Sequence, residues 1–228
     1  MSGAGRKRIL LLGIGNLLWA DEGFGVRVIE HLQKHYRFPD QVQVVDGGTQ
    51  GVYLIEHVQN AEVLVVFDAV DYGLAPGTLK RVENADVPNF LGAKKMSLHQ
   101  TGFQEVLAMA QMLGAYPESL LLIGVQPEEL EDYGGSLTSK VKAQIQPAIE
   151  LALAYLADCG VTAEPLATEV ELADPILNIG RYETERPDAD SACRLGDERV
   201  VRSAAFEVRP PQPLTDALPI DVDYRGKY

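Results

Sequence analysis

The feature that most constrains the fold is a regular alternation of short apolar runs with amphipathic segments over residues 8–158. The apolar runs are rich in Val, Leu and Ile, which is typical of parallel strands buried on both faces. We expect strands at 8–13, 43–46, 63–68, 78–82 and 119–125, and helices at 24–36, 51–59, 101–113 and 137–157. This order predicts an α/β fold, a three-layer α/β/α sandwich with right-handed crossovers and a mainly parallel sheet.

Two details of this pattern need a local explanation. The strand at 78–82 follows the preceding strand through a tight turn containing Pro76 and Gly77, with no helix between them. It is therefore expected at the edge of the sheet, antiparallel to its neighbour. Pro147 lies inside the last expected helix, where it either kinks the helix or marks its true start.

The chain is expected to form one α/β domain over residues 1–160, followed by a tail over 161–228. The helix and strand periodicity fails from about Val161, and the remaining residues are rich in proline and charge. Such a segment is a poor candidate for a core of its own. No independent fold is predicted for it, and it is expected to be disordered or ordered only against the domain or a partner.

Charge and hydropathy exclude several classes of function. The chain carries a formal net charge of −13 and has a pI near 4.7, whereas nucleic-acid binding needs clustered Lys and Arg. No apolar run is long enough for a transmembrane helix. The apolar N-terminal stretch ends in a Gly-Asn turn rather than a signal-peptide cleavage site, so a cytoplasmic protein without membrane insertion is expected. Cys159 and Cys193 form no CxxC pair and are read as ordinary thiols.

The first expected loop begins like a dinucleotide-binding turn and then departs from it. Gly13 and Gly15 follow the first strand, but Leu18 stands where the fingerprint has its third glycine. Asp21 and Glu22 then place negative charge where a pyrophosphate would lie. A nucleotide-binding domain is therefore disfavoured, and no Walker A loop, G-x-S-x-G or H-E-x-x-H motif is present.

Ligands of open parallel sheets bind outside the carboxyl ends of the strands, and acidic residues gather at that edge here. Glu22, Asp68 and His99 would supply two carboxylates and an imidazole, a set that suits Zn²⁺, Ni²⁺ or Mn²⁺ with positions left open. Asp46 and Asp71, with the amide of Asn16, are candidates for orienting such ligands.

Each of the three candidate ligands also has a structural explanation. Glu22 precedes a helix, and the helix macrodipole stabilises acidic side chains at that end. Asp68 ends a buried strand, where Asp often caps or turns the chain. His99 lies before the expected helix in a loop that could cross the same edge, but capping by Ser97 or Thr101 would make it an ordinary first-turn residue. Asp46 could simply bond its own turn.

Several longer motifs, in this order, resemble the maturation endopeptidases of [NiFe] hydrogenases. They are GIGNLLWADEGFGVRVIEHL, VDGGTQG, FDAVDYGLAPGTL, KKMSLHQTGFQEVLA and GVQPEELEDYGGSLT. The resemblance covers residues 7 to about 160 and is greatest to the branch that serves membrane-bound uptake hydrogenases (the HyaD/HupD type). It implies a twisted five-stranded sheet between helices.

The resemblance also implies a function and a site. Such proteases remove a short C-terminal extension from the hydrogenase large-subunit precursor once nickel has been inserted. The family's metal ligands match Glu22, Asp68 and His99, and the nickel is expected to be supplied by the precursor. Either the metal or a carboxylate activates water, with Asp68 as base assisted by Glu22, or nickel only positions the bond and an aspartate alone drives hydrolysis, as in an aspartyl protease. The alternative function is a chaperone-like protein that binds the nickel-loaded precursor without cutting it.

Overall fold

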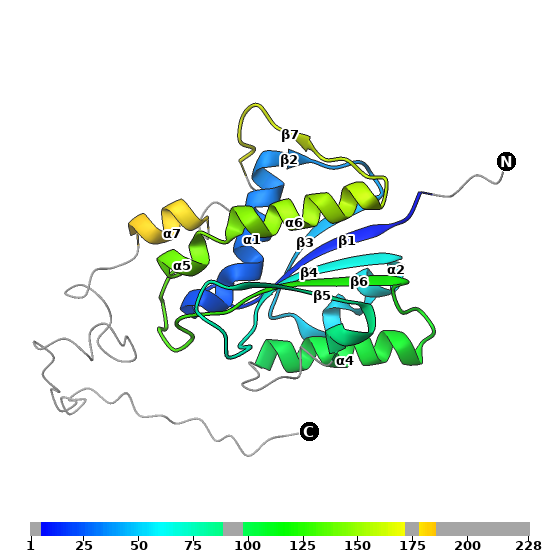
Figure 1. Ribbon diagram of the computed structural model, residues 1–228, viewed down its shortest axis with the longest axis horizontal. Coiled ribbons are helices and arrows are strands. Elements are labelled where there is room, and N and C mark those ends of the chain that lie inside the picture. Colours follow the sequence, from blue (N-terminus) through cyan, green and yellow to red (C-terminus); the bar gives the residue numbers. More distant parts are fainter. Residues whose placement is uncertain (1–5, 89–97, 172–177, 186–228) are drawn as a thin grey trace, which may run out of the picture.

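The computed structural model describes residues 6–88, 98–171 and 178–185 (Figure 1). Among these residues, five strands form the main sheet in the order β3-β1-β4-β6-β5. The strands are β1 (Ile9–Ile14), β3 (Val42–Gly48), β4 (Val63–Ala69), β5 (Leu79–Glu83) and β6 (Ser119–Val125). Strands β1, β3, β4 and β6 run parallel, and β5 is antiparallel to β6. The predicted mainly parallel sheet and its antiparallel edge strand are thus confirmed.

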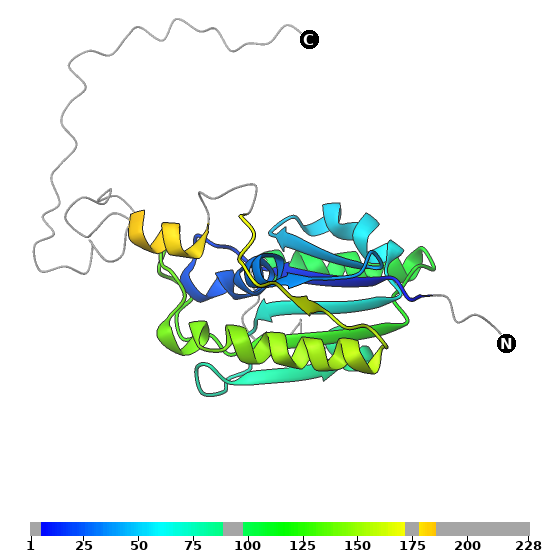
Figure 2. The same cartoon turned by 90° about the horizontal axis from the view of Figure 1, so that it is seen from above.

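The three middle strands are apolar on both faces because both faces are covered. Every residue of β1 and of β4 is buried, and β6 is buried after its first residue. On one face lie α1 (Phe24–His35) and α6 (Ile145–Asp158), and on the other lie α2 (Ile55–Asn60) and α4 (Leu98–Met112), as Figure 2 shows. Two separate core clusters result, one on each face, and the predicted three layers are confirmed.

The helix expected over 137–157 is two helices. Residues Ser139–Lys142 form α5, and α6 begins at Ile145. Pro147 is the third residue of α6, in the first turn, where its missing N–H removes no intrahelical hydrogen bond. It therefore marks the start of a helix and kinks nothing. The helix expected at 51–59 likewise begins as the 3₁₀ turn η2 (Gly51–Leu54) before α2.

Parts of the expected tail pack against the α/β domain. β7 (Glu164–Pro165) pairs antiparallel with β2 (Tyr36–Arg37), a two-residue pair too short to show a periodicity in the sequence. Residues Ile179–Glu185 form α7, which lies beside α5 and α1 in Figure 1. The expectation that residues 161–228 lack an independent fold stays a prediction, and residues 172–177 and 186–228 lie outside the described part.

Candidate functional site

The site lies at the edge where β1, β3, β4 and β6 end, called here the carboxyl edge. Glu22 and Asp68 are brought toward each other by Gly25, which packs between the ends of β1 and β4. A Cβ at Gly25 would collide with the carbonyl oxygens of Ile14 and Phe67. This close approach seats the start of α1, and the 3₁₀ turn η1 before it, against the end of β4. Glu22 and Asp68 thus share one edge, as the sequence predicts.

Asp68 is the second-to-last residue of β4 and is completely buried. Its neighbour in β6 is Gly124, and a Cβ there would collide with the hydroxyl of Tyr72. Burial, with a smaller contribution from the charge of Asp68, raises the pKa of the Tyr72 phenol. The phenol therefore remains neutral at physiological pH beside the carboxylate. Sequence reasoning missed Tyr72, whose only signal is its position three residues after the strand end.

Glu22 is half-buried and its backbone is fixed by the turn that precedes it. It belongs to η1 (Ala20–Gly23), and its carbonyl accepts the N–H of Asn16 at 3.2 Å. Gly15 has a φ of 147° and lies so close to the carbonyl of Glu22 that a Cβ would collide with it. Ala20 has a φ of 38°, an uncommon conformation for a residue with a side chain. The glycines that resemble a nucleotide-binding turn therefore shape the backbone that carries Glu22.

Asp21, next to Glu22, has a structural role. It is fully buried, and its Oδ2 accepts the N–H groups of Glu128 and Glu129, both at 2.9 Å. Its carboxylate also accepts the N–H of Thr138 at 2.7 Å and the hydroxyl of Thr138 at 3.1 Å. All of these donors belong to residues 126–138, called here the β6–α5 loop. Asp21 therefore fastens this loop to η1 through four hydrogen bonds.

The side chains of the three candidates for orienting ligands form local hydrogen bonds. In each case a side-chain oxygen accepts the backbone N–H of the residue two positions later. Asp46 accepts from Gly48 (2.9 Å), Asp71 from Gly73 (2.9 Å) and Asn16 from Leu18 (3.0 Å). For Asp46 this is the turn-bonding alternative that the sequence left open. Burial raises the pKa of its carboxyl.

Gln126 is a further residue of the site that sequence reasoning did not single out. It is buried at the end of β6, and its Oε1 accepts the N–H groups of Tyr72 at 2.8 Å and Leu74 at 3.1 Å. Its Nε2 donates to Oδ1 of Asp71 at 3.0 Å. Gln126 thus holds the loop after β4, including Tyr72, in place. The signal available in the sequence was an amide side chain directly after an apolar run.

For His99, the structure agrees with the first-turn alternative that the sequence left open. Its backbone is the second residue of α4 (Leu98–Met112), in the first turn rather than in a preceding loop. The side chains of residues 98–101 and the whole of 89–97 lie outside the described residues. Within the part of the chain that the structure describes, no group of three or more His, Cys, Asp or Glu side chains could hold a metal ion. The three-ligand set of Glu22, Asp68 and His99 therefore stays a prediction.

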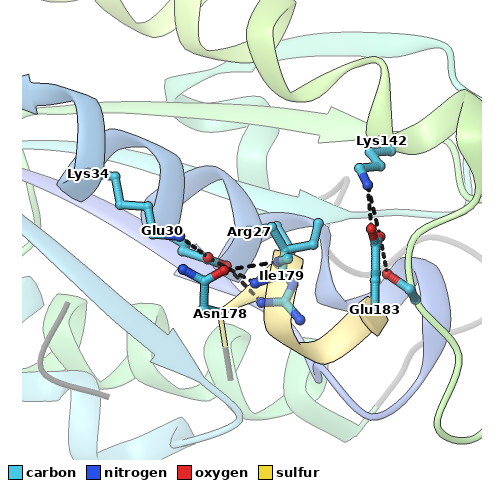
Figure 3. Close-up of polar contacts among 9 residues, drawn as sticks. Arg27, Glu30, Lys34, Lys142, Asn178, Ile179 and Glu183 are labelled. Atoms are coloured by element: carbon cyan, nitrogen blue, oxygen red, sulfur yellow. Dashed lines mark hydrogen bonds and ion pairs between the residues drawn. The ribbon is translucent and has the colours of Figure 1, made fainter. Parts of the chain in front are cut away.

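A buried ion-paired cluster on α1 borders the site and holds α7 (Figure 3). Glu30 Oε2 accepts from Arg27 at 2.7 Å, and its Oε1 accepts from Lys34 at 2.7 Å and from the N–H of Ile179 at 3.0 Å. All three charged side chains are nearly buried. Burial alone would raise the pKa of Glu30, but the hydrogen bonds from Lys34 and Arg27 outweigh it and lower the pKa.

The other end of α7 contacts α5 and the β6–α5 loop. Glu183 accepts from Nζ of Lys142 at 2.7 Å and from the hydroxyl of Ser136 at 2.8 Å (Figure 3). The guanidinium of Arg27 lies 5.3 Å from the ring centroid of Tyr182. Helix α7 therefore contacts the same loop that Asp21 fastens to η1.

Comparison with known proteins gives a consistent result. The family model described as HycI, a hydrogenase maturation protease, matches residues 26–155. The hydrogenase expression/formation protein HupD of Thiocapsa roseopersicina is 61% identical over 213 residues, covering 91% of this chain and 96% of that protein. The hydrogenase 2 maturation protease of Escherichia coli (strain K12) is 44% identical over 159 residues, covering 69% of this chain and 96% of that protein. Asp68 and His99 fall inside the matched family region, and Glu22 precedes it by four residues.

Solved structures agree with the sequence comparison. The hydrogenase maturating endopeptidase HYBD from E. coli superposes with a TM-score of 0.66 at 42% identity, covering 69% of this chain and 97% of that chain. A [NiFe] hydrogenase maturation protease, HybD from Thermococcus kodakarensis, gives a TM-score of 0.52 at 28% identity, covering 66% and 99% of the two chains. Within the described residues, no helix combines the length and the apolar character that crossing a membrane requires.

Proposed function

Because this chain belongs to the family of hydrogenase maturation proteases, we propose that it cleaves the C-terminal extension from a [NiFe]-hydrogenase large-subunit precursor after nickel insertion. The observation that carries this proposal is the placement of Glu22 and Asp68 at one carboxyl edge, where open parallel sheets bind their ligands. The protein acts in the cytoplasm, where the precursor is matured.

The nickel belongs to the substrate in this proposal. Two carboxylates, and the imidazole of His99, complete the coordination of a nickel ion that the precursor already holds. Carboxylate and imidazole are suitable ligands for a divalent ion of this kind, and an incomplete set leaves room for ligands from the precursor. A precursor without nickel would then bind weakly, so cleavage would wait for metal insertion.

Asp68 acts as the general base in hydrolysis. Its carboxylate takes a proton from the water that attacks the scissile carbonyl and returns it to the leaving amine as the C–N bond breaks. Glu22 helps to hold the reacting groups, and the nickel ion positions or polarises the peptide. The phenol of Tyr72 lies beside Asp68, and burial, which raises the pKa of the phenol, further favours its neutral form.

The test is to incubate the protein with nickel-loaded and nickel-free precursor and to measure the precursor's mass. Wild-type protein is expected to shorten only the loaded form at its C-terminus. Asp68→Asn and Glu22→Gln should each lower the cleavage rate on the order of 100-fold or more. Glu56→Gln, on the exposed side of α2, is the matched control and should cleave normally.

Two outcomes would overturn the proposal. Normal cleavage by Asp68→Asn and Glu22→Gln would remove the assigned site. Tight binding of the loaded precursor by wild-type protein without any loss of mass would establish the chaperone-like alternative. Thermal melts of the variants separate a loss of chemistry from a loss of folding.

A further inference from the structure

Large hydrophobic side chains are exposed in the loops that follow the parallel strands. Among the described residues, eight large hydrophobic side chains are substantially exposed, and five of them lie in these loops. These five, called here the edge surface, are Leu18 after β1, Val52 and Tyr53 after β3, Leu74 after β4, and Tyr133 after β6. Single exposed hydrophobic residues are ordinary, but a set surrounding one edge marks an interaction surface.

The loops that carry this surface are held by specific contacts. The N–H of Gly134 donates to the carbonyl of Leu18 at 2.7 Å, and the rings of Trp19 and Tyr133 pack edge to face at 5.2 Å. Leu74 donates its N–H to Gln126, at the start of the β6–α5 loop. Three of the four loops are therefore fastened to one another, and the surface exists before any partner binds.

Together, the same loops carry negative charge. Residues 15–23, 49–54, 70–78 and 126–138 contain seven Asp and Glu, four of them in 126–138 and none in 49–54, and no Lys, Arg or His. Asp21 is buried and Glu128 is ion-paired with Lys140, but Glu131 is exposed and Glu129 and Asp132 are partly exposed next to Tyr133. A partner that fits here presents apolar side chains together with positive charge, because like charges would be repelled.

We propose, building on the proposed function, that the edge surface docks the segment of the large-subunit precursor around the scissile bond. A peptide that reaches Glu22 and Asp68 at the carboxyl edge meets these loops, because they follow the strands that end there. The charge of the loops assigns that segment its chemistry: apolar residues accompanied by Lys or Arg. The surface therefore contributes to substrate affinity, and the two carboxylates contribute to the chemical step.

The test compares two sets of substitutions on exposed hydrophobic residues. Tyr53→Ser and the double variant Leu18→Ser/Tyr133→Ser alter the edge surface. The control, Met112→Ser/Leu113→Ser, removes two exposed side chains at the end of α4, which leads to the start of β6 and so lies at the opposite edge of the sheet. Tyr53 is 81% exposed, so its substitution removes few packing contacts, and a thermal melt of each variant checks that it remains folded.

The expected result is a rise in KM for the nickel-loaded precursor of about tenfold in the edge variants, with kcat little changed, and no change in the control. Added salt should also raise KM, and precursor variants with Glu in place of Lys or Arg near the cut should bind more weakly. An equal KM in edge and control variants would overturn the docking surface. A KM that does not change with salt would overturn the proposal that the docked segment carries Lys or Arg. Failure of the wild-type protein to cleave would instead refute the proposed function.

Discussion

Two buried carboxylates, Asp21 and Glu30, each hold a distant segment, and they do so by different means. Asp21 accepts four hydrogen bonds from uncharged donors in the β6–α5 loop. Glu30 accepts from two cations, Arg27 and Lys34, and from one backbone N–H of α7. The first is a carboxylate balanced by peptide dipoles, and the second is an ion-paired cluster.

The difference lies in what happens when each carboxylate is lost. The β6–α5 loop runs from the buried strand β6 into α5, whose Val141 lies in the core, so both ends of the loop are anchored. Helix α7 is joined to the domain mainly by polar contacts at Glu30, Lys142 and Ser136, with Ile179 against the core. Loss of Glu30 can therefore be relieved by release of α7, which lets water reach Arg27 and Lys34. Loss of Asp21 cannot be compensated in this way, because the β6–α5 loop is not free to detach.

The largest effect is expected from Asp21→Ala. The substitution leaves three backbone N–H groups and a hydroxyl of the β6–α5 loop without their acceptor, which should cost about 3 kcal/mol of unfolding free energy. Thr138→Val removes only the hydroxyl bond and should cost about 1 kcal/mol. Urea denaturation measures both values. Equal stability of Asp21→Ala and wild type would show that the loop is held by other contacts.

A smaller effect is expected from Glu30→Ala, about 1–2 kcal/mol, because release of α7 spares the two cations most of the penalty of unpaired burial. Backbone amide exchange should quicken in α7 and stay slow in α1. Exchange that quickens equally in both helices would contradict the proposal that α7 is released while α1 stays folded.

The same cluster makes the docking of α7 sensitive to acid. The pKa of Glu30 is lowered in the folded state from a reference value of 4.5, so its stabilising contribution is present above that value and is lost as the pH falls through the folded pKa. The Ile179 amide resonance should therefore shift only below pH 4.5. A resonance that shifts near neutral pH would assign the change to another group.

The smallest effect is expected from Lys142→Ala. Its ion pair with Glu183 is partly solvent-exposed and should contribute at most about 0.5 kcal/mol. Glu183 keeps the hydroxyl of Ser136, so α7 should stay docked. Release of α7 by this substitution alone would mean that the contacts with α5, rather than those with Glu30, hold the helix.

The sequence predicts the layers and fails where the structure depends on contacts between distant residues. Apolar runs such as those of β1 and β4 are recognisable because both faces of the sheet are covered. The β2–β7 pair and α7 escaped prediction because neither has a periodicity of its own. Pro147 allowed two explanations, and only the observed start of α6 decides between them.

The site shows the same division. The positions of Glu22 and Asp68 follow from the rule that strand ends meet at one edge. The structural role of Asp21 could not be predicted, because the donors that bind its carboxylate lie more than 100 residues away in the sequence. Tyr72 and Gln126 were missed for a similar reason, since their roles arise only when the loops after β4 and β6 pack together.

The most direct test of the account is X-ray absorption at the nickel edge on the precursor alone and on its complex with this protein. The account predicts that nickel gains oxygen or nitrogen ligands in the complex and that Glu22→Gln reduces this gain. An unchanged nickel environment in a complex that goes on to cleave would contradict it.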